Sequence, residues 1–260
     1  MKISVITATF NSGGTLRDTL ESVLGQGYKD VEHLIIDGGS TDSTLDIVRK
    51  YEPRYGERLR WISERDHGIY DAMNKGIAMA SGEVIGLLNS DDFYTSPDVL
   101  QAVAEALRDP SLDAVYGDVH YVGHDDLTRT TRYYSSAGFR RWKMRLGWMP
   151  AHPSFYCRKQ IYERYGTFDI SFKIGADFEN LLRLIYVNGI RTRYLPIDFV
   201  TMRSGGASTS GLKSHRQIFN DHLRAYRKNG VHSNALFESL RYAAKIKELA
   251  AFKLKASLGL

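Results

Sequence analysis

The 260-residue chain has one cysteine and no obvious run of apolar residues of transmembrane length. A single cysteine, Cys157, excludes a framework of intramolecular disulfides and fits a reducing compartment. The run from Val84 to Leu88 has the length of a strand, well short of the ~20 residues that a transmembrane helix needs. The segment from Ile3 to Phe10 is too short and too polar for a signal peptide. We therefore expect a cytoplasmic protein.

The sequence also lacks internal repeats and low-complexity linkers. Its composition, with 43% apolar and 25% charged residues, is that of an ordinary globular protein, so global disorder is excluded. A chain of this length can bury a full hydrophobic core within one domain.

Acidic residues are scarce in one part of the chain. Residues 211–260 contain ten Lys or Arg and three Asp or Glu, whereas residues 1–210 are close to balance. Such a basic segment favours contact with anionic lipid or another polyanion, although a solvated helix face gives the same pattern.

Strand-like and helix-like patterns alternate over the first 120 residues. The predicted strands cover 3–7, 31–36, 59–62, 83–88 and 113–116, and the predicted helices cover 15–24, 41–51, 69–80 and 97–108. Further along we expect strands near 154–157 and 199–202 and helices over about 177–187, 212–228 and 235–256. The alternation predicts an α/β fold with a mostly parallel central sheet, helices on both faces and a C-terminal helical extension.

Polar clusters follow four of the predicted strands, at 7–9, 37–40, 64–66 and 89–92. The carboxyl ends of parallel strands meet at one edge of the sheet, where ligands bind in such folds. We therefore expect a single binding crevice that receives all four clusters.

Asp91 and Asp92 follow the apolar strand 83–88 directly. Adjacent carboxylates repel one another unless a cation or hydrogen-bond donors offset their charge, and oxygen ligands suit Mg²⁺ or Mn²⁺. An ordinary turn also favours Asn, Ser and Asp, so these residues alone leave both interpretations open.

Several motifs, and their order along the chain, closely resemble those of the family 2 glycosyltransferases. Members of this family have the GT-A fold and transfer sugars with inversion. The motifs are Ile6 to Asn11, Ile36 to Asp42, Asp66 to Gly76, Leu88 to Asp92, His152-Pro153-Ser154 and Gly175 to Glu179. The resemblance covers residues 1–208, so we expect a GT-A domain over 1–210 and a basic helical extension over 211–260. Two positions depart from the family pattern: Ala8 replaces a common Pro, and Asn89 replaces the first Asp of an Asp-x-Asp motif.

The resemblance implies a role for each matching position. It implies nucleotide-sugar contacts by Thr7, Thr9, Asn11, Asp37, Asp66, Asn74, Lys75, Asp91 and Arg203. It implies a metal site at Asp92 and Asp91, with His152 as a further candidate ligand. Mn²⁺ or Mg²⁺ would stabilise the charge that develops on the leaving diphosphate.

An inverting transfer also needs a general base for the acceptor hydroxyl. Asp177 occupies the family's position for that base, although Ala176 replaces the Glu that usually precedes it. Glu179 is the alternative base, and Asp177 could instead serve only as a helix cap.

We expect this enzyme to move one sugar from a nucleotide-sugar, by default a UDP-sugar, to a glycan or a polyprenyl-diphosphate-linked acceptor in surface polysaccharide synthesis. It would work in the cytoplasm or at the inner face of the cytoplasmic membrane, touching the membrane through 211–260. The sequence leaves association into a homo-oligomer open.

Two rival functions are a nucleotidyltransferase that forms nucleotide-sugars and a nucleic-acid-binding protein using the basic stretch 129–148 and the tail. The acidic crevice argues against nucleic acid as a partner.

Overall fold

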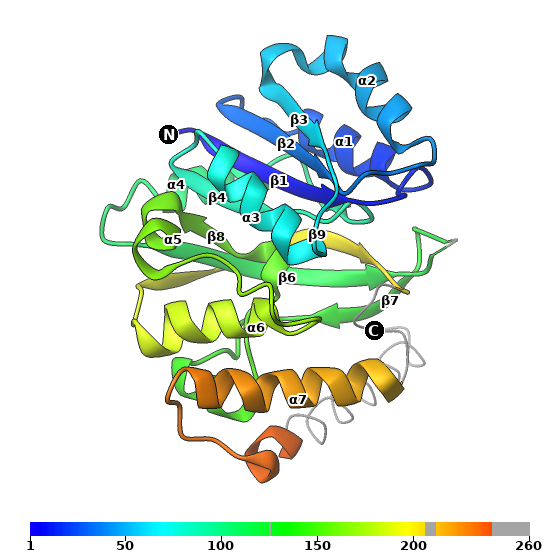
Figure 1. The fold of residues 1–260 in the computed structure, drawn as a ribbon. Helices are drawn as coiled ribbons and strands as arrows, with labels where there is room; N and C mark the ends of the chain where they lie inside the picture. The colour runs from blue at the N-terminus through cyan, green and yellow to red at the C-terminus, as the bar shows by residue number, and fades with distance from the viewer. Residues whose placement is uncertain (125, 206–211, 241–260) are drawn as a thin grey trace.

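The computed structural model of the protein describes residues 1–124, 126–205 and 212–240 (Figure 1). Nine strands form one sheet: β1 Ile3–Thr9, β2 Val31–Asp37, β3 Leu59–Ser63, β4 Val84–Leu87, β5 Phe93–Tyr94, β6 Ala114–Val122, β7 Thr130–Tyr134, β8 Tyr156–Arg158 and β9 Thr192–Arg203. The main helices are α1 Leu16–Leu24, α2 Thr44–Tyr55, α3 Ile69–Met79, α4 Val99–Ala106, α5 Lys159–Tyr165, α6 Ala176–Leu181 and α7 Leu212–Lys228. Shorter turns of helix are η1 Gly56–Arg58, η2 Arg141–Leu146, η3 His152–Ser154 and η4 Leu182–Val187.

The strand order is β3-β2-β1-β4-β8-β6-β9-β5, and β7 pairs with β6 beside this path. Strands β1 to β4 run parallel to one another, so their carboxyl ends lie at one edge. Strand β8 enters antiparallel between β4 and β6, and β9 then runs parallel to β6. The sheet is therefore parallel in its first half and mixed in its second.

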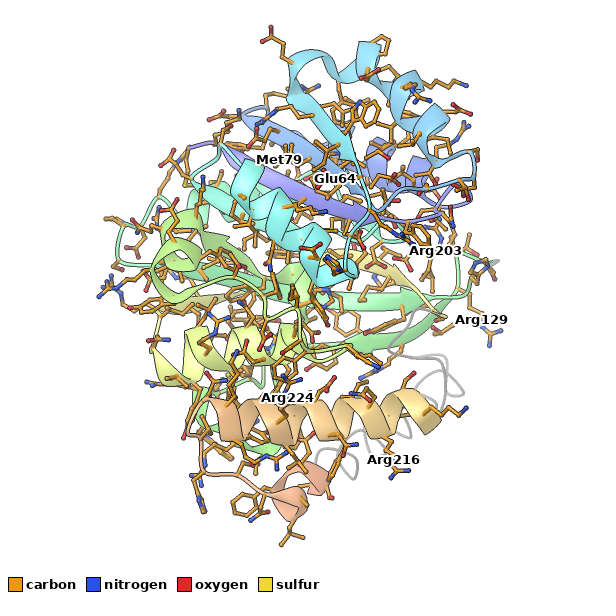
Figure 2. All side chains as sticks on the ribbon, viewed as in Figure 1. Glu64, Met79, Arg129, Arg203, Arg216 and Arg224 are labelled. Carbon is orange, nitrogen blue, oxygen red and sulfur yellow. The ribbon has the colours of Figure 1, made fainter. Side chains whose placement is uncertain are left out.

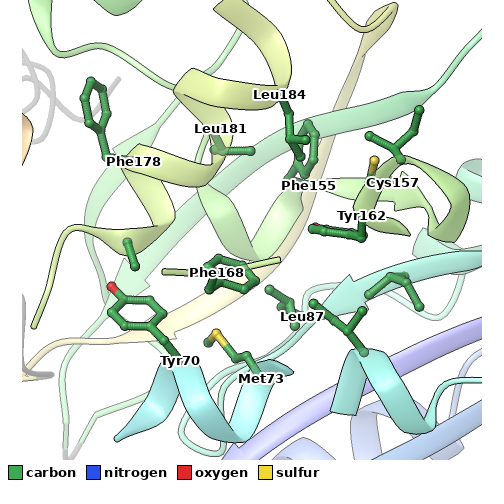
Figure 3. Close-up of a cluster of buried hydrophobic side chains, with 14 of the residues drawn as sticks. Tyr70, Met73, Leu87, Phe155, Cys157, Tyr162, Phe168, Phe178, Leu181 and Leu184 are labelled. Atoms are coloured by element: carbon green, nitrogen blue, oxygen red, sulfur yellow. The ribbon is translucent and has the colours of Figure 1, made fainter. Parts of the chain in front are cut away.

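Two hydrophobic cores cover the two faces of the sheet. Apolar residues of α1, α2 and α4 pack on one face, against alternate residues of β1 such as Ile3 and Val5. Residues of α3, α5, α6 and α7 pack on the other face, against Ile6 and Ala8. Figure 3 shows Tyr70 and Met73 of α3 pointing toward Phe168 in this second core. The strict alternation along β1 is the ordinary consequence of a strand between two layers.

The predicted α/β architecture with helices on both faces is confirmed, including the five strands of the first 120 residues. The structure adds the short strand β5 and the hairpin strand β7, and it places β8 between the fourth and fifth predicted strands. The helix expected over 177–187 is present as α6 followed by the π-helical turn η4. The helix expected at 235–256 is seen over 235–240, and its remainder lies outside the described residues.

Within the described part of the chain, none of the helices combines the length and the apolar character that crossing a bilayer would require.

Gly86 allows the close packing of β4 on its neighbour β8. A Cβ at this position would overlap the ring of Tyr156, which is fully buried. We predict that Gly86→Ala lowers the free energy of unfolding by about 1–3 kcal/mol, because a full core resists an added methyl group. Gly14→Ala is the matched control, since a Cβ there meets no atom within 4 Å and should change stability by less than about 0.5 kcal/mol. Equal denaturant midpoints for the two variants would contradict this packing.

Candidate active site

The turn Asn89 to Asp92 follows β4 and is fixed from two sides. Within the turn, Asn89 Nδ2 donates to Asp92 Oδ2 at 2.9 Å, and the Asp92 N–H donates to the Asn89 carbonyl at 3.1 Å. From α1, the buried Thr19 hydroxyl donates to the Asp92 carbonyl at 2.7 Å. These contacts hold Asp92, which is 1% exposed, in one position at the carboxyl edge of the sheet.

The two carboxyl groups of this turn are costly to ionise together. Burial raises the pKa of Asp91. Burial, followed by repulsion from Asp91, raises the pKa of Asp92 well above its usual range. Arg203 partly offsets this charge: its guanidinium donates to the Asp91 carbonyl at 2.6 Å, pairs with Asp18 and lies 5.3 Å from the Phe93 ring centroid. Figure 2 labels Arg203 on the side toward which β1 points.

The carboxylate pair fits a divalent cation that shares its shell with a ligand. Among residues 1–240, apart from the undescribed 125 and 206–211, no three His, Cys, Asp or Glu side chains gather closely enough to hold a metal by themselves. Mg²⁺ and Mn²⁺ commonly take one or two protein carboxylates and complete their shells with water and substrate phosphates. The buried Asp92 and the partly buried Asp91, which repel one another, supply this kind of incomplete oxygen site.

Asp91 and Asp92 open into a cavity of about 400 Å³. Its lining includes the charged or ionisable residues Asp91, Asp92, Arg132, His152, Lys173, Asp177, Arg203 and His222. The rest of the wall is largely apolar or aromatic: Ile69, Tyr70, Met73, Tyr121, Tyr134, Trp148, Met149, Pro150, Met202 and Ile218. The cavity thus brings charged groups from separate parts of the chain together with apolar and aromatic side chains.

Asp177 lies in the first turn of α6 and lines the cavity. Its Oδ1 accepts the Phe178 N–H at 2.8 Å, and its Oδ2 lies 3.4 Å from Nδ1 of His152. Burial lowers the pKa of His152, with the nearby Asp177 and Asp91 acting in the opposite direction. Tyr70, which also lines the cavity, donates to the Ile174 carbonyl and so fixes the loop that leads into α6. Asp177 therefore has a defined orientation in the cavity that the Asp91–Asp92 turn also lines.

Glu179, the alternative base predicted from sequence, is positioned differently. Its side chain is fully buried and accepts hydrogen bonds from Arg183 at 3.2 Å, Lys228 at 3.2 Å and Asn229 at 3.1 Å. It does not line the cavity. This corrects the expectation for Glu179: its role is to join α6 to α7.

Three loops meet beyond the cavity, at the ends of β1, β2 and β3. The Gly38 N–H donates to the Thr9 carbonyl at 2.9 Å, and Asn11 Oδ1 accepts the Thr41 N–H at 2.9 Å. The Thr9 hydroxyl is buried there and has no hydrogen-bond partner in the described structure. The same loop group joins the cavity through Ser12, whose hydroxyl is 2.8 Å from that of Ser90.

Asp37 organises this loop group. Its carboxylate accepts the N–H groups of Gly39 and Ser40 and the hydroxyls of Ser40 and Ser63, at 2.5–3.0 Å. The side chain is fully buried, so in this structure it shapes the loop and presents no exposed oxygen.

Asp66 and Lys75 lie along the same loops. A Cβ at Gly38 would come within 2.5 Å of Asp66 Oδ2, so only glycine admits the carboxylate this close to the β2 turn. Lys75 Nζ pairs with Glu64 at 2.9 Å and donates to the Arg65 carbonyl at 3.1 Å. Asp66 is thus held at the surface next to the loop group, and Lys75 supports the segment that carries it.

Two predicted nucleotide-contacting residues are engaged elsewhere, and we correct both. Thr7 is fully buried on the α1 side of the sheet, where its hydroxyl is 2.9 Å from Nε2 of His33. Asn74 binds the backbone of Phe168 twice, donating to its carbonyl at 2.8 Å and accepting its N–H at 2.9 Å. Thr7 faces away because side chains alternate along β1, and Asn74 ties α3 to the loop before α6.

Sequence reasoning missed several residues that build the site. Thr19 and Asp18 on α1 anchor the Asp91–Asp92 turn and Arg203, yet both look like ordinary exposed positions of an amphipathic helix. The cavity wall from Tyr121, Tyr134 and Trp148 was also missed. The unusual density of aromatic residues between 121 and 148 was the signal that could have located it.

The residues 4–166 match the family described as "Glycosyl transferase family 2". This match covers more than half of the chain. The chain belongs to this family. It is therefore a glycosyltransferase, as the sequence motifs predicted.

Curated relatives agree with this assignment. A "PGL/p-HBAD biosynthesis glycosyltransferase" of Mycobacterium bovis is 32% identical over 196 residues, covering 75% of this chain and 73% of that protein. An "Uncharacterized glycosyltransferase MT1564" of Mycobacterium tuberculosis is 33% identical over 225 residues, which cover 84% of this chain and 80% of that protein.

Solved structures share the GT-A fold. Residues 1–349 of S. aureus TarS in complex with UDP-GlcNAc superpose with a TM-score of 0.67 at 19% identity, covering 89% of this chain and 68% of that one. A longer S. aureus TarS chain also matches, and the superposition covers 43% of that chain. A Pyrobaculum calidifontis mannosyltransferase in complex with GDP-Man and Mn²⁺ superposes with a TM-score of 0.64 at 18% identity, covering 99% and 79%.

The contacts of Asn74 predict that this residue contributes to stability and not to nucleotide binding. We predict that Asn74→Ala lowers the free energy of unfolding by about 1–3 kcal/mol, because two backbone groups of Phe168 lose their partner. The dissociation constant for UDP with Mn²⁺, measured by calorimetry on the folded protein, should stay within about twofold of wild type. The exposed Asn220 on α7 provides the control Asn220→Ala, with no expected change in either quantity. A large loss of UDP affinity with unchanged stability would restore Asn74 to the nucleotide site.

Proposed function

We propose that this glycosyltransferase is inverting and metal-dependent and moves one sugar from a nucleotide-sugar to a glycan or lipid-linked acceptor. The observation that carries the proposal is the cavity whose lining includes both Asp177 and the Asp91–Asp92 turn. The Asp177 carboxylate would then serve the acceptor, and the carboxylates of Asp91 and Asp92 would serve the donor. This division is what a single displacement at a sugar carbon requires.

The donor nucleotide would occupy the loop group at the ends of β1 to β3. Thr9 offers a buried hydroxyl without a protein partner, and Asn11 and Asp66 border the same loops. Asp37 would act by shaping the turn, because its buried carboxylate holds Gly39, Ser40 and Ser63 in place. UDP is our first choice of nucleotide, and the GDP-mannose-bound structural relative makes GDP the second to test.

The diphosphate would lie between this loop group and the cavity, next to Asp91 and Arg203. Asp92 and Asp91 would hold Mn²⁺ or Mg²⁺ there, with His152 as a further candidate. When bound, the ion supplies positive charge that stabilises the diphosphate as it departs. Arg203 adds a fixed guanidinium to the same region, held by its contacts to Asp18 and the Asp91 carbonyl.

Asp177 would act as the general base. Its Oδ2 takes the proton of the acceptor hydroxyl, whose oxygen forms a bond to the anomeric carbon. The bond from that carbon to the diphosphate oxygen breaks, and its electron pair leaves with the diphosphate. Because attack and departure occur on opposite faces, the configuration inverts. The Phe178 N–H on Oδ1 orients the carboxylate for this transfer.

The acceptor would occupy the apolar part of the cavity, where Trp148, Tyr121 and Tyr134 offer flat surfaces to a sugar ring or an apolar chain. A polyprenyl-diphosphate-linked acceptor, a role in surface polysaccharide synthesis and a cytoplasmic location stay predictions. So do assembly into a homo-oligomer and membrane contact through 211–260, much of which lies outside the described residues.

A substitution of Asp92 tests the proposed metal site for the donor diphosphate. We predict that Asp92→Asn reduces kcat/KM for release of the nucleoside diphosphate at least about 100-fold, because the amide keeps the volume but loses the charge that holds a cation. Release of UDP or GDP from a panel of nucleotide-sugars, with Mn²⁺ and water as acceptor, is the measurement. Asp46→Asn on the exposed surface of α2 is the control and should retain wild-type turnover. Full activity of the Asp92 variant, or of wild type in excess chelator, would exclude the metal assignment.

The carboxylate at position 177 tests the acceptor side separately. We predict that Asp177→Asn reduces kcat by about 100-fold or more and leaves the affinity for UDP with Mn²⁺ unchanged, because the base is absent from the donor contacts. Calorimetry measures the affinity, and single-turnover release of nucleoside diphosphate measures the chemical step. Turnover near the wild-type rate would move the base to another residue.

A further inference from the structure

Three segments far apart in sequence meet at one end of the molecule. They are η2, the end of η4, and the stretch from 231 to 240 that follows α7. Arg141 Nε donates to the Tyr186 carbonyl at 3.1 Å, which joins η2 to η4. Arg145 Nε donates to the His232 carbonyl at 2.8 Å, and the Ser233 hydroxyl donates to the Arg145 carbonyl at 2.6 Å, which joins η2 to the third segment. Figure 1 shows 231–240 below α7, at the end opposite α2.

Each of these segments exposes large apolar side chains. Trp142 is 59% exposed on η2, Val187 is 45% exposed at the end of η4, and Leu236 and Leu240 are 70% and 47% exposed. Trp142 follows Arg141, and Val187 follows the Tyr186 that Arg141 binds, so both lie at one junction. Single exposed apolar residues need no explanation, but several on adjoining segments indicate an interaction surface.

The same segments are positively charged. Residues 137–147 contain Arg140, Arg141, Lys143 and Arg145 and no acidic residue, whereas the whole chain has 35 basic and 30 acidic residues. The only acidic residue in 229–240 is Glu238, which is fully buried and lies 2.9 Å from Nδ1 of His222. Its charge therefore does not reach this surface.

We propose that this surface, formed by Arg140 to Lys143, Val187, Leu236 and Leu240, docks on an anionic lipid membrane. Mixed cationic, aromatic and aliphatic groups match the interface of such a membrane, where arginine and lysine meet headgroups and Trp and Leu reach the acyl boundary. A nucleic acid would also attract the cations and Trp142, but it offers nothing to the aliphatic Val187, Leu236 and Leu240. Lipid satisfies both kinds of group.

The docked orientation places the cavity near the membrane. Segment η2 continues directly into Gly147 to Ala151, which forms one wall of the cavity. An acceptor anchored in the membrane would thus be close to this wall. Membrane docking itself does not depend on the proposed reaction, because its test below measures lipid binding alone.

Cosedimentation of the full chain with lipid vesicles tests the proposal. We expect binding to vesicles of phosphatidylcholine mixed with phosphatidylglycerol, weaker binding to phosphatidylcholine alone, and loss of binding at high salt. The double variant Arg140→Gln/Lys143→Gln should bind about twentyfold more weakly, and Trp142→Ser/Leu236→Ser at least about tenfold more weakly. The controls are Arg49→Gln/Lys50→Gln on α2 and Leu127→Ser between β6 and β7, which change the same kinds of residue elsewhere and should bind like wild type.

Tryptophan fluorescence locates the contact. Wild type should show a blue shift on adding the anionic vesicles, and Trp142→Phe should keep most of the affinity while losing much of the shift.

Equal affinity of the surface variants and the controls, or no binding of wild type to anionic vesicles, would overturn the proposal. Light scattering that finds a dimer in wild type and a monomer in the surface variants would instead identify an interface between two copies. Retention on duplex DNA without vesicle binding would identify a nucleic-acid surface.

Discussion

The repulsion between two adjacent carboxyl groups, the partly buried Asp91 and the buried Asp92, constrains the rest of the site. Buried charge is tolerated only where donors or opposite charge surround it, and the fold supplies these from distant segments. Thr19 fixes the turn from α1, and Arg203 approaches from the end of β9. We propose that a divalent cation, which would also bind the donor diphosphate, offsets the remaining negative charge. The same feature that makes the turn unfavourable for the free protein thus makes it suitable for a charged ligand.

Sheet topology explains why these groups meet. The parallel strands β1, β2 and β3 deliver the nucleotide loops to one edge, and β4 delivers the carboxylate turn beside them. The second half of the sheet is mixed, and its connections bring His152 and Asp177 to the same edge from the opposite side. In the proposed reaction, the donor and the acceptor would therefore be held by residues from the two halves of one sheet.

The first half of the fold could be predicted from sequence because its strands and helices alternate with clear periodicity. The position of β8 between β4 and β6 could not, since a three-residue strand such as Tyr156 to Arg158 carries almost no pattern and its partners are set by tertiary packing. Five residues that motif resemblance selected line one cavity, namely Asp91, Asp92, His152, Asp177 and Arg203, and their roles stay predictions. The resemblance failed for Thr7 and Asn74, because a motif gives the position of a residue and not the direction of its side chain. Alternation along β1 turns Thr7 toward His33, and the helical phase of α3 turns Asn74 toward Phe168.

The central claim is that the Asp91–Asp92 turn receives a cation together with the diphosphate of a nucleotide. A crystal grown with Mn²⁺ and UDP, measured at the manganese absorption edge, tests it most directly. The account predicts an anomalous peak in coordination contact with Asp92 or Asp91 and with the diphosphate, and a uridine within the loops that carry Thr9, Asn11 and Asp66. A bound nucleotide with manganese elsewhere, or a nucleotide outside these loops, would contradict it.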